Sequence, residues 1–384
     1  MPPTTAKAPR MSPLDSHALD LDQLSRRNRL RALRPRLGHD FSSNDYLGLA
    51  ADGSLRPAIM EALARGVPIG SGGSRLLRGN HEEHEALERE AASFFGAEAA
   101  LFFSSGYAAN TALLSTLPQR GDLVVHDELI HASGHEGLRL GRAESLPVKH
   151  NEPDAFEAAI LAWRNRGGRG RVWIAVESLY SMDGDRAPLD QLSALANAHD
   201  AVLIIDEAHA TGVFGQGGRG LAADLEGGEN VITLRTCGKT LGCEGALVCG
   251  PALVRDFLVN RARSFIFSTA PSPLMASAVR AALRIVGQEP QRRESLHELA
   301  AYAEERFVRL GATPTGTQIL PLVIGDDKRT MQVAETLQMA GFDVRGIRPP
   351  TVPVGTSRLR ISLTLNVDRP AIDELGAVLE RAIA

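Results

Sequence analysis

Residues 202–209 read Val-Leu-Ile-Ile-Asp-Glu-Ala-His, and residues 231–239 read Val-Ile-Thr-Leu-Arg-Thr-Cys-Gly-Lys. Each stretch is a short apolar run, typical of a buried strand, followed by polar residues. The first run ends in Asp206, and Lys239 closes the second stretch after a glycine. In an open parallel sheet, ligands bind beyond the carboxyl ends of the strands. These two stretches therefore predict an α/β fold with a ligand site at one edge of a parallel sheet.

Apolar runs and helical patterns alternate through most of the chain. Expected strands lie at 100–103, 123–126, 172–177, 201–206, 231–234 and 246–249, and expected helices at 82–95, 108–117, 154–164 and 189–198. This alternation predicts a mostly parallel central sheet with helices on both faces. From about residue 271, expected helices at 273–286, 293–310 and 330–340 and strands at 319–323 and 357–363 indicate a smaller α+β domain.

We therefore expect three regions along the chain. An N-terminal tail and an amphipathic helix at about 17–34 occupy residues 1–40. A large ligand-binding domain follows at 41–272, and a small C-terminal domain at 273–384.

Composition and charge argue against several classes of protein. The 384 residues carry a net charge of -4, which disfavours nucleic acid and anionic membranes as partners. No apolar run approaches the roughly 18 residues that a membrane-spanning helix needs. Cys237, Cys243 and Cys249 lie six residues apart, a spacing that fits neither a zinc motif nor a disulfide framework. Because residues 1–13 also lack the apolar core of a signal peptide, we expect a cytoplasmic protein with free thiols and no metal site.

The aspartate and the lysine together indicate a particular cofactor. Taken alone, Asp206 is as easily a turn residue, and Lys239 a solvated surface group. As a pair they suit pyridoxal 5'-phosphate (PLP), since a lysine amine holds its aldehyde and an aspartate holds its pyridine nitrogen protonated. Gly238 leaves room for backbone beside such a ring. The pair therefore favours a PLP site over two unrelated residues.

Other residues beyond the expected strands suit the same site. Gly106 and Tyr107 follow a strand and open a helix, where backbone N–H groups bind phosphate, although Tyr107 could equally belong to the core. Thr236 could donate its hydroxyl to the same phosphate. Glu177 ends another strand. His131 could stack on the ring or could be a structural histidine. His209 could reach the phenolic oxygen of the cofactor.

Two familiar motifs do not fit their usual contexts. Residues 215–220 match the glycine pattern of dinucleotide-binding proteins, but they lie nine residues beyond a strand and open no helix, so we expect a loop. Residues 81–84 read His-Glu-Glu-His, which has the order of neither common zinc-protease motif and begins a charged helix face. A dehydrogenase and a metalloenzyme are therefore both poor alternatives.

Five stretches between residues 41 and 365 resemble motifs of the α-oxoamine synthases. These are Phe-Ser-Ser-Asn-Asp-Tyr-Leu-Gly-Leu at 41–49, Ile-Gly-Ser-Gly-Gly-Ser-Arg at 69–75, Ser-Gly-Tyr at 105–107, Ser-Met-Asp-Gly-Asp at 181–185 and Asp-Glu-Ala-His-Ala-Thr-Gly at 206–212. Members of this family are fold-type I PLP-dependent transferases that condense an amino acid with an acyl thioester. The resemblance implies that fold, that cofactor and that class of reaction.

The resemblance also implies roles for single residues at the cofactor. Lys239 would carry PLP and take the Cα proton of the amino acid, Asp206 would pair with the pyridine nitrogen, and His131 would stack on the ring. Further cofactor contacts are implied for Ser181, His209, Gly106, Tyr107 and Thr236. Because the family site lies at a homodimer interface, Ser268 and Thr269 would reach the partner's phosphate.

The substrate side of the site is implied in the same way. Arg360 would clamp the amino-acid carboxylate, a task that suits the planar guanidinium. The remaining substrate contacts would come from Asn44, His131, Arg348 and Thr351. An arginine near the N-terminal helix also contacts substrate in the family. Arg34 is our prediction for it, and Arg31 is the alternative.

Residues 347–353, Ile-Arg-Pro-Pro-Thr-Val-Pro, are most similar to one branch of the family. That branch joins L-alanine to a pimeloyl thioester, carried by CoA or acyl-carrier protein, in biotin biosynthesis. Sibling reactions of glycine or serine with other acyl-CoA thioesters stay open, as does a non-catalytic partner subunit, although such subunits lack the lysine. Arg78 and Glu244 depart from the family pattern and leave the acyl chain open.

Overall fold

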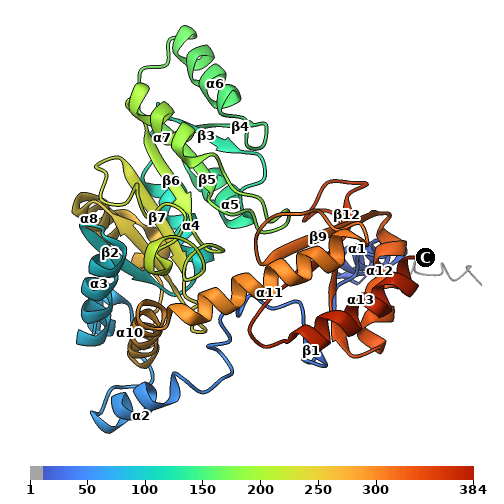
Figure 1. Cartoon of the computed structure of the whole chain (residues 1–384). Helices are drawn as coiled ribbons and strands as arrows, with labels where there is room; N and C mark the ends of the chain where they lie inside the picture. The colour runs from blue at the N-terminus through green and yellow to red at the C-terminus, as the bar shows by residue number, and fades with distance from the viewer. Residues whose placement is uncertain (1–11) are drawn as a thin grey trace, which may run out of the picture.

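The computed structural model describes residues 12–384, and Figure 1 shows a large and a small sheet connected by a long helix, α11 (Pro290–Val308). Within these residues the large sheet has the strand order β2-β8-β7-β6-β5-β3-β4. Its strands are β2 Ala99–Phe103, β3 Leu123–Asp127, β4 Glu144–Val148, β5 Val172–Glu177, β6 Val202–Asp206, β7 Val231–Thr236 and β8 Ala246–Gly250. Only β8 pairs antiparallel, with β2 and β7. The predicted, mostly parallel sheet is confirmed.

Helices cover both faces of the large sheet, because side chains of a strand point alternately to opposite sides. Leu203 and Ile205 pack in one core with residues of two helices, whereas Ile204 packs in a second core on the other face. The first face is covered by α6 Pro153–Asn165 and α7 Leu189–Ala198, and the second by α4 Gly106–Thr116, α8 Ala252–Arg261 and α9 Arg263–Ile266. α5 Ala132–Leu140 packs against α4. The layered arrangement expected from the sequence is confirmed.

The edge strand β4 is the clearest element that the apolar pattern does not predict. It is short, mostly exposed and contains Pro147, features that are typical of a strand at the edge of a sheet. The other elements of this part are α2 Arg56–Ala64, η1 Arg75–Gly79, α3 Glu82–Phe95 and η2 Gln216–Gly218. The glycine-rich stretch 215–220 is a loop around η2, as predicted.

The C-terminal part has its own sheet, with the order β11-β12-β9. Its elements are α10 Pro273–Gln288, α11, β9 Ile319–Gly325, α12 Asp327–Met339, β10 Phe342–Asp343, β11 Arg345–Ile347, β12 Ser357–Ser362 and α13 Arg369–Ile383. β10 pairs with β1 (His39–Asp40) from the start of the chain. α10 lies beside α2 and α3 under the large sheet, and α11 runs from there to the small sheet (Figure 1). A domain boundary between residues 272 and 273 stays a prediction.

The N-terminal helix is shorter than the predicted range 17–34. α1 spans Asp15–Arg26 and has no buried residue, so no packing extends it. Asn28 adopts a positive φ of 54°, which ends the helix, and Pro35 disfavours helical backbone at the preceding residue. Residues 31–37 are exposed. The arginines of this segment are therefore presented from an irregular chain and not from one helix face.

Among residues 12–384, no helix is both long enough and apolar enough to cross a membrane.

Candidate active site

Polar residues gather where the parallel strands of the large sheet end. In the register of the sheet, Asp206 at the end of β6 lies beside Glu177 at the end of β5. Thr236 ends β7, and Lys239 follows it by three residues. The predicted convergence on one edge of the sheet is thus present in the structure.

The Asp206 carboxylate is held in a fixed orientation. Its Oδ2 accepts a hydrogen bond from Asn110 Nδ2 at 2.7 Å, and its Oδ1 accepts one from the Ala208 backbone N–H at 2.9 Å. Asn110 comes from α4 and also donates to Ser133 Oγ of α5 at 3.1 Å. Hydrogen bonds from α4 and from the turn after β6 therefore orient this carboxylate, which suits pairing with a pyridine nitrogen.

Lys239 lies within the electrostatic reach of several partners. Burial lowers the pKa of its amine, while the nearby carboxylates of Asp206 and Glu177 partly offset this effect. Burial and the Asp206 charge raise the pKa of Glu177 well above its usual value. An amine with a lowered pKa is more often neutral, and a neutral amine is the form that attacks an aldehyde or takes a proton.

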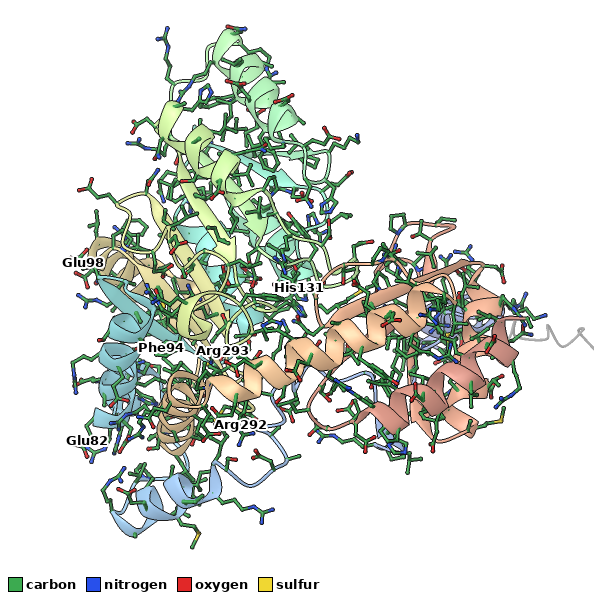
Figure 2. All side chains as sticks on the ribbon, in the orientation of Figure 1. Glu82, Phe94, Glu98, His131, Arg292 and Arg293 are labelled. Atoms are coloured by element: carbon green, nitrogen blue, oxygen red, sulfur yellow. The ribbon has the colours of Figure 1, made fainter. Side chains whose placement is uncertain are left out.

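The imidazole of His131 is fixed at the start of α5. Its Nδ1 lies 2.7 Å from Ser133 Oγ and accepts from the Ser133 backbone N–H at 3.2 Å. Burial lowers the pKa of His131, with Asp206 acting against this effect and Lys239 adding to it. Figure 2 shows His131 between the large sheet and the C-terminal part. A neutral, oriented ring at this place suits stacking on a flat cofactor.

A buried network joins His209 to Arg360. The Tyr46 hydroxyl lies 2.6 Å from His209 Nδ1 and 3.0 Å from Asn44 Oδ1, and it accepts from Arg360 Nη2 at 3.4 Å. Arg360 also donates to Asn44 Oδ1 at 2.9 Å and, through Nε, to the Ser181 carbonyl at 2.5 Å. Burial, Lys239 and Arg360 hold the pKa of His209 well below its usual value. The network therefore fixes the predicted carboxylate clamp beside the lysine.

The start of α4 has the features of a phosphate site. Ser105 caps the helix by accepting from the Ala108 N–H at 3.1 Å. A Cβ on Gly106 would come within 2.5 Å of Thr236 Cγ2, so only glycine allows the end of β7 to approach this closely. A cavity of about 370 Å³ adjoins this turn and is lined by Ser105, Tyr107, Ala108, Thr111, Arg263, Ser264, Phe267 and Ser268. Helix N–H groups, hydroxyls and one guanidinium fit a phosphate dianion.

A larger cavity of about 610 Å³ adjoins the same edge of the sheet. Its lining includes His131, Ser181 and Thr351, all predicted site residues, together with Arg31. Arg31 Nη2 donates to Thr351 Oγ1 at 3.3 Å. Arg34, our predicted substrate contact, instead donates to Gln338 Oε1 at 2.8 Å and is not part of the cavity lining. The structure therefore places the alternative, Arg31, at the cavity.

The remaining predicted residues differ in whether they line either cavity. Arg348 does not line the large cavity; burial lowers its pKa, and Arg31 and Arg29 add to this effect. Ser268 lines the phosphate cavity of its own chain, whereas the exposed Thr269 does not. Arg78 and Glu244 are exposed and line neither cavity.

Sequence reasoning missed three residues of the site. Asn110 orients Asp206, Tyr46 joins His209 to Arg360, and Arg263 lines the phosphate cavity. Two of them had a usable signal, since Tyr46 lies within the quoted stretch 41–49 and Asn110 lies one helical turn after Gly106. Arg263 had no such signal, because it lies outside every motif that the sequence analysis identified.

Together the groups suit a PLP site, and residues 38–379 match the aminotransferase class I and II family. The chain belongs to this family and, within it, to the α-oxoamine synthases, and it is a PLP-dependent acyltransferase. The 8-amino-7-oxononanoate synthase of Geobacter sulfurreducens is 41% identical, over 95% of this chain and 97% of its own. That of Chromobacterium violaceum is 43% identical, over 88% of this chain and 87% of its own.

Solved structures place the chain in the same fold. A serine palmitoyltransferase variant from S. paucimobilis, with bound PLP and myriocin, has a TM-score of 0.86 and 25% identity. The match covers 96% of this chain and 97% of that one. The predicted fold-type I PLP-dependent transferase fold and the predicted cofactor are confirmed.

Proposed function

We propose that this chain condenses L-alanine with a pimeloyl thioester to give 8-amino-7-oxononanoate, CO2 and a free thiol, a step of biotin biosynthesis. The observation that carries this proposal is that the buried Lys239 lies within electrostatic reach of Asp206, Arg360 and His131, and that His131 lines the 610 Å³ cavity. The similarity to two 8-amino-7-oxononanoate synthases supports the choice of substrates.

Each group has a task in this reaction. When bound, PLP supplies an electron sink for the negative charge that develops on the amino-acid Cα. Arg360, held by the Ser181 carbonyl and Asn44, binds the alanine carboxylate. Lys239 Nζ carries the cofactor and then takes the Cα proton, a role that its lowered pKa favours. Asp206, oriented by Asn110, keeps its negative charge against the pyridine nitrogen.

The acyl chain has a place beside these groups. The lining of the 610 Å³ cavity includes His131 and Ser181, and it also includes Arg31 and Thr351. A cavity of this size suits a medium-length acyl chain. The cation of Arg31 at its far side suits an anionic group on the acyl thioester.

A homodimer with shared active sites is part of the proposal. Tyr107 and Phe267, which line the phosphate cavity, are large, exposed apolar residues, and so are Ile69 and Leu77. The segment with Ile69 is tied to the segment after Phe267 by the hydrogen bond from Ser272 Oγ to the Ile69 carbonyl at 2.5 Å. An exposed apolar cluster of this kind indicates an interface. We infer that a second copy covers it and that Ser268 and Thr269 approach the partner's phosphate there. A cytoplasmic location stays a prediction.

A sibling reaction is the second candidate. The likeness to a serine palmitoyltransferase favours it, because that enzyme shares the fold over nearly the whole chain. The third possibility, a non-catalytic partner subunit, finds no support, because Lys239 and its surroundings are intact.

A release assay tests these alternatives. Free thiol released from pimeloyl-CoA is measured with L-alanine, glycine and L-serine in turn. We expect alanine to give a kcat/KM at least about tenfold above the other two, the size of discrimination that one methyl or hydroxyl group supports. A preference for glycine or serine would contradict the alanine assignment, and no release with any of the three would contradict the acyl donor.

A further inference from the structure

His150 lies between two carboxylates close to the larger cavity. Its Nδ1 is 2.9 and 3.0 Å from the two carboxylate oxygens of Asp127. Its Nε2 is 2.7 Å from Asp185 Oδ2. None of these residues has a role in the proposed reaction, and the cluster combines three separate segments of the chain.

The geometry assigns a positive charge to this ring. A carboxylate only accepts hydrogen bonds, and a neutral imidazole has a single N–H, so both ring nitrogens can donate only in the imidazolium form. Asp127 is ionised, since it also accepts from the Leu129 N–H at 2.8 Å and from the Asn151 N–H at 2.9 Å. Burial lowers the pKa of His150, but the hydrogen bonds to Asp127 and Asp185 outweigh this effect and raise it to about 10.

The two carboxylates flank two different segments of the cavity lining, which we call its two walls. Asp127 ends β3 and begins the turn that leads to His131, and residues 128–132 line one wall. Asp185 closes the turn that contains Ser181, because its carbonyl accepts from the Tyr180 N–H at 2.9 Å. Residues 180–183 line the other wall. His150 follows β4 at the edge of the sheet (Figure 1) and connects the two walls through one ring.

Tyr180 separates the imidazolium from the cavity. Its ring meets that of His150 edge to face, with centroids 4.4 Å apart and an angle of 89° between the planes. Tyr180 is buried and also lines the cavity. A change at His150 can therefore reach the cavity through Tyr180 as well as through the two turns.

Among the described residues, no neighbouring cation could take the place of the His150 imidazolium between Asp127 and Asp185. On its own segment the Lys149 amine pairs with Glu152, and directly after β3 the Glu128 carboxylate accepts from the His150 backbone N–H at 3.2 Å. After β5, Glu177 contributes a further acidic group. Two cations lie on the Ser181 side. They are Arg186, which donates to the Gly316 carbonyl, and Arg358, which pairs with Asp183. Loss of the imidazolium would therefore leave Asp127 and Asp185 facing each other without a cation between them.

We propose that His150 is a positioning residue that fastens the two walls of the 610 Å³ cavity together and thereby sets the affinity for the acyl thioester. The inference rests on the proposed function in that the acyl chain occupies this cavity. The amino-acid carboxylate would be bound by Arg360, whose Nε donates to the Ser181 carbonyl. Its two Nη atoms are held from outside the two walls, by Asn44, Tyr46 and Ser362.

Replacement of the ring by phenylalanine tests the fastening. His150→Phe keeps a flat ring against Tyr180 but removes both N–H donors. In the PLP-loaded enzyme we expect the KM for pimeloyl-CoA to rise about tenfold, the size expected for a lost charge-assisted hydrogen bond. The dissociation constant for alanine, read from the cofactor absorbance, should change by less than about twofold. His199→Gln, which removes a histidine 3.4 Å from Glu157 on the far side of α6, is the control and should change neither value.

Amide hydrogen exchange gives a measurement that does not depend on the reaction. We expect peptides covering 128–132 and 180–185 to exchange faster in His150→Phe than in the wild type and in His199→Gln. A wild-type enzyme that is inactive with pimeloyl-CoA would contradict the proposed function alone. Unchanged exchange in both peptides, or an unchanged pimeloyl-CoA KM in an active enzyme, would overturn the positioning role.

Asp185→Asn provides a second variant, because the Asp185 side chain is partly exposed and its replacement leaves the buried packing of the His150 ring in place. With one carboxylate removed, the imidazolium loses its proton at a lower pH. The KM for pimeloyl-CoA should then rise with pH between about 6 and 9 in Asp185→Asn but stay level in the wild type. Parallel profiles for the two proteins would overturn the inference.

Discussion

Arg31 and Arg34 lie three residues apart, but their surroundings differ. Arg31 lines the large cavity and contacts Thr351, whereas Arg34 contacts Gln338 on α12. We expect Arg31→Ala to raise the KM for pimeloyl-CoA about tenfold, because a cation beside an anionic substrate is removed. Arg34→Ala, the matched control, should change this KM by less than about twofold. Steady-state kinetics of both variants check the expectation, and the reverse order would restore Arg34 as the substrate contact.

His150 also makes a prediction for stability against pH. Its pKa is about 10 in the folded protein, against an ordinary value of 6.5. Its contribution to the free energy of unfolding is therefore complete below about pH 6.5 and is lost as the pH rises through about 10. Burial alone would raise the pKa of Asp127, but the hydrogen bonds that it accepts lower it below its ordinary value of 3.8. Asp127 therefore stabilises the folded protein above about pH 3.8, and this stabilisation is lost as the pH falls below that value. We expect His150→Phe to cost about 2 kcal/mol in free energy of unfolding near neutral pH.

Urea unfolding of wild type and His150→Phe at several pH values measures this difference. The difference should shrink as the pH approaches about 10 and again as it falls below about 4. An equal difference at all pH values would show that the ring stabilises only by packing.

The single residues that sequence could identify are those whose chemistry shows in their local context. Asp206 and Lys239 each follow a recognisable strand, so their roles could be predicted. Asn110 and Tyr46 act on partners 96 and 163 positions away, and His150 joins residues from two other segments. Such pairings depend on the strand order, which local patterns do not contain.

The contact between α4 and α5 positions Asn110 and therefore Asp206. A Cβ on Gly137 of α5 would lie 2.9 Å from Leu114 Cβ and 3.0 Å from the Asn110 carbonyl of α4. We expect Gly137→Val to lower the free energy of unfolding by about 2 kcal/mol, since a larger side chain forces two packed helices apart. It should also weaken PLP binding. Leu140→Val, at an exposed position of the same helix, should change neither. Thermal unfolding and PLP titration are the measurements, and equal behaviour of both variants would contradict this account.

Helices with a buried face could be predicted well, and helices without one could not. The ranges predicted for α3 and α7 agree with the structure residue for residue, because apolar residues recur along their buried sides. α1 buries nothing and ends eight residues before its predicted end. An apolar pattern marks a helix only where the folded chain gives it a surface to pack against.

The molecule as a whole should work as a pair of chains. Phe267, in the lining of the phosphate cavity, is 72% exposed, and Leu77 is 84% exposed. We expect Phe267→Asp to shift the protein toward monomer in sedimentation experiments and to weaken PLP binding at the same time, because a charge is placed in an apolar interface. Leu161→Asp on α6, away from this cluster, should leave the assembly unchanged. A dimer that persists in Phe267→Asp would place the interface elsewhere.

The overall layout could be predicted from the alternation of strands and helices, whereas the order of the strands could not. β8 pairs with the distant β2, and β5 pairs with β3 and not with β4, the strand that precedes it in the chain. The large and small sheets meet around the site through one shared core, which local sequence patterns do not reveal.

The covalent link between Lys239 and PLP is the central claim, and the lysine content of the chain allows a direct test. The sequence has only four lysines, at positions 7, 149, 239 and 328. The PLP-loaded protein is reduced with borohydride, which makes the link to the cofactor permanent, and its peptides are mapped by mass spectrometry. We predict the added pyridoxyl mass on Lys239 alone. The added mass on another lysine, or no added mass on any lysine, would contradict the account.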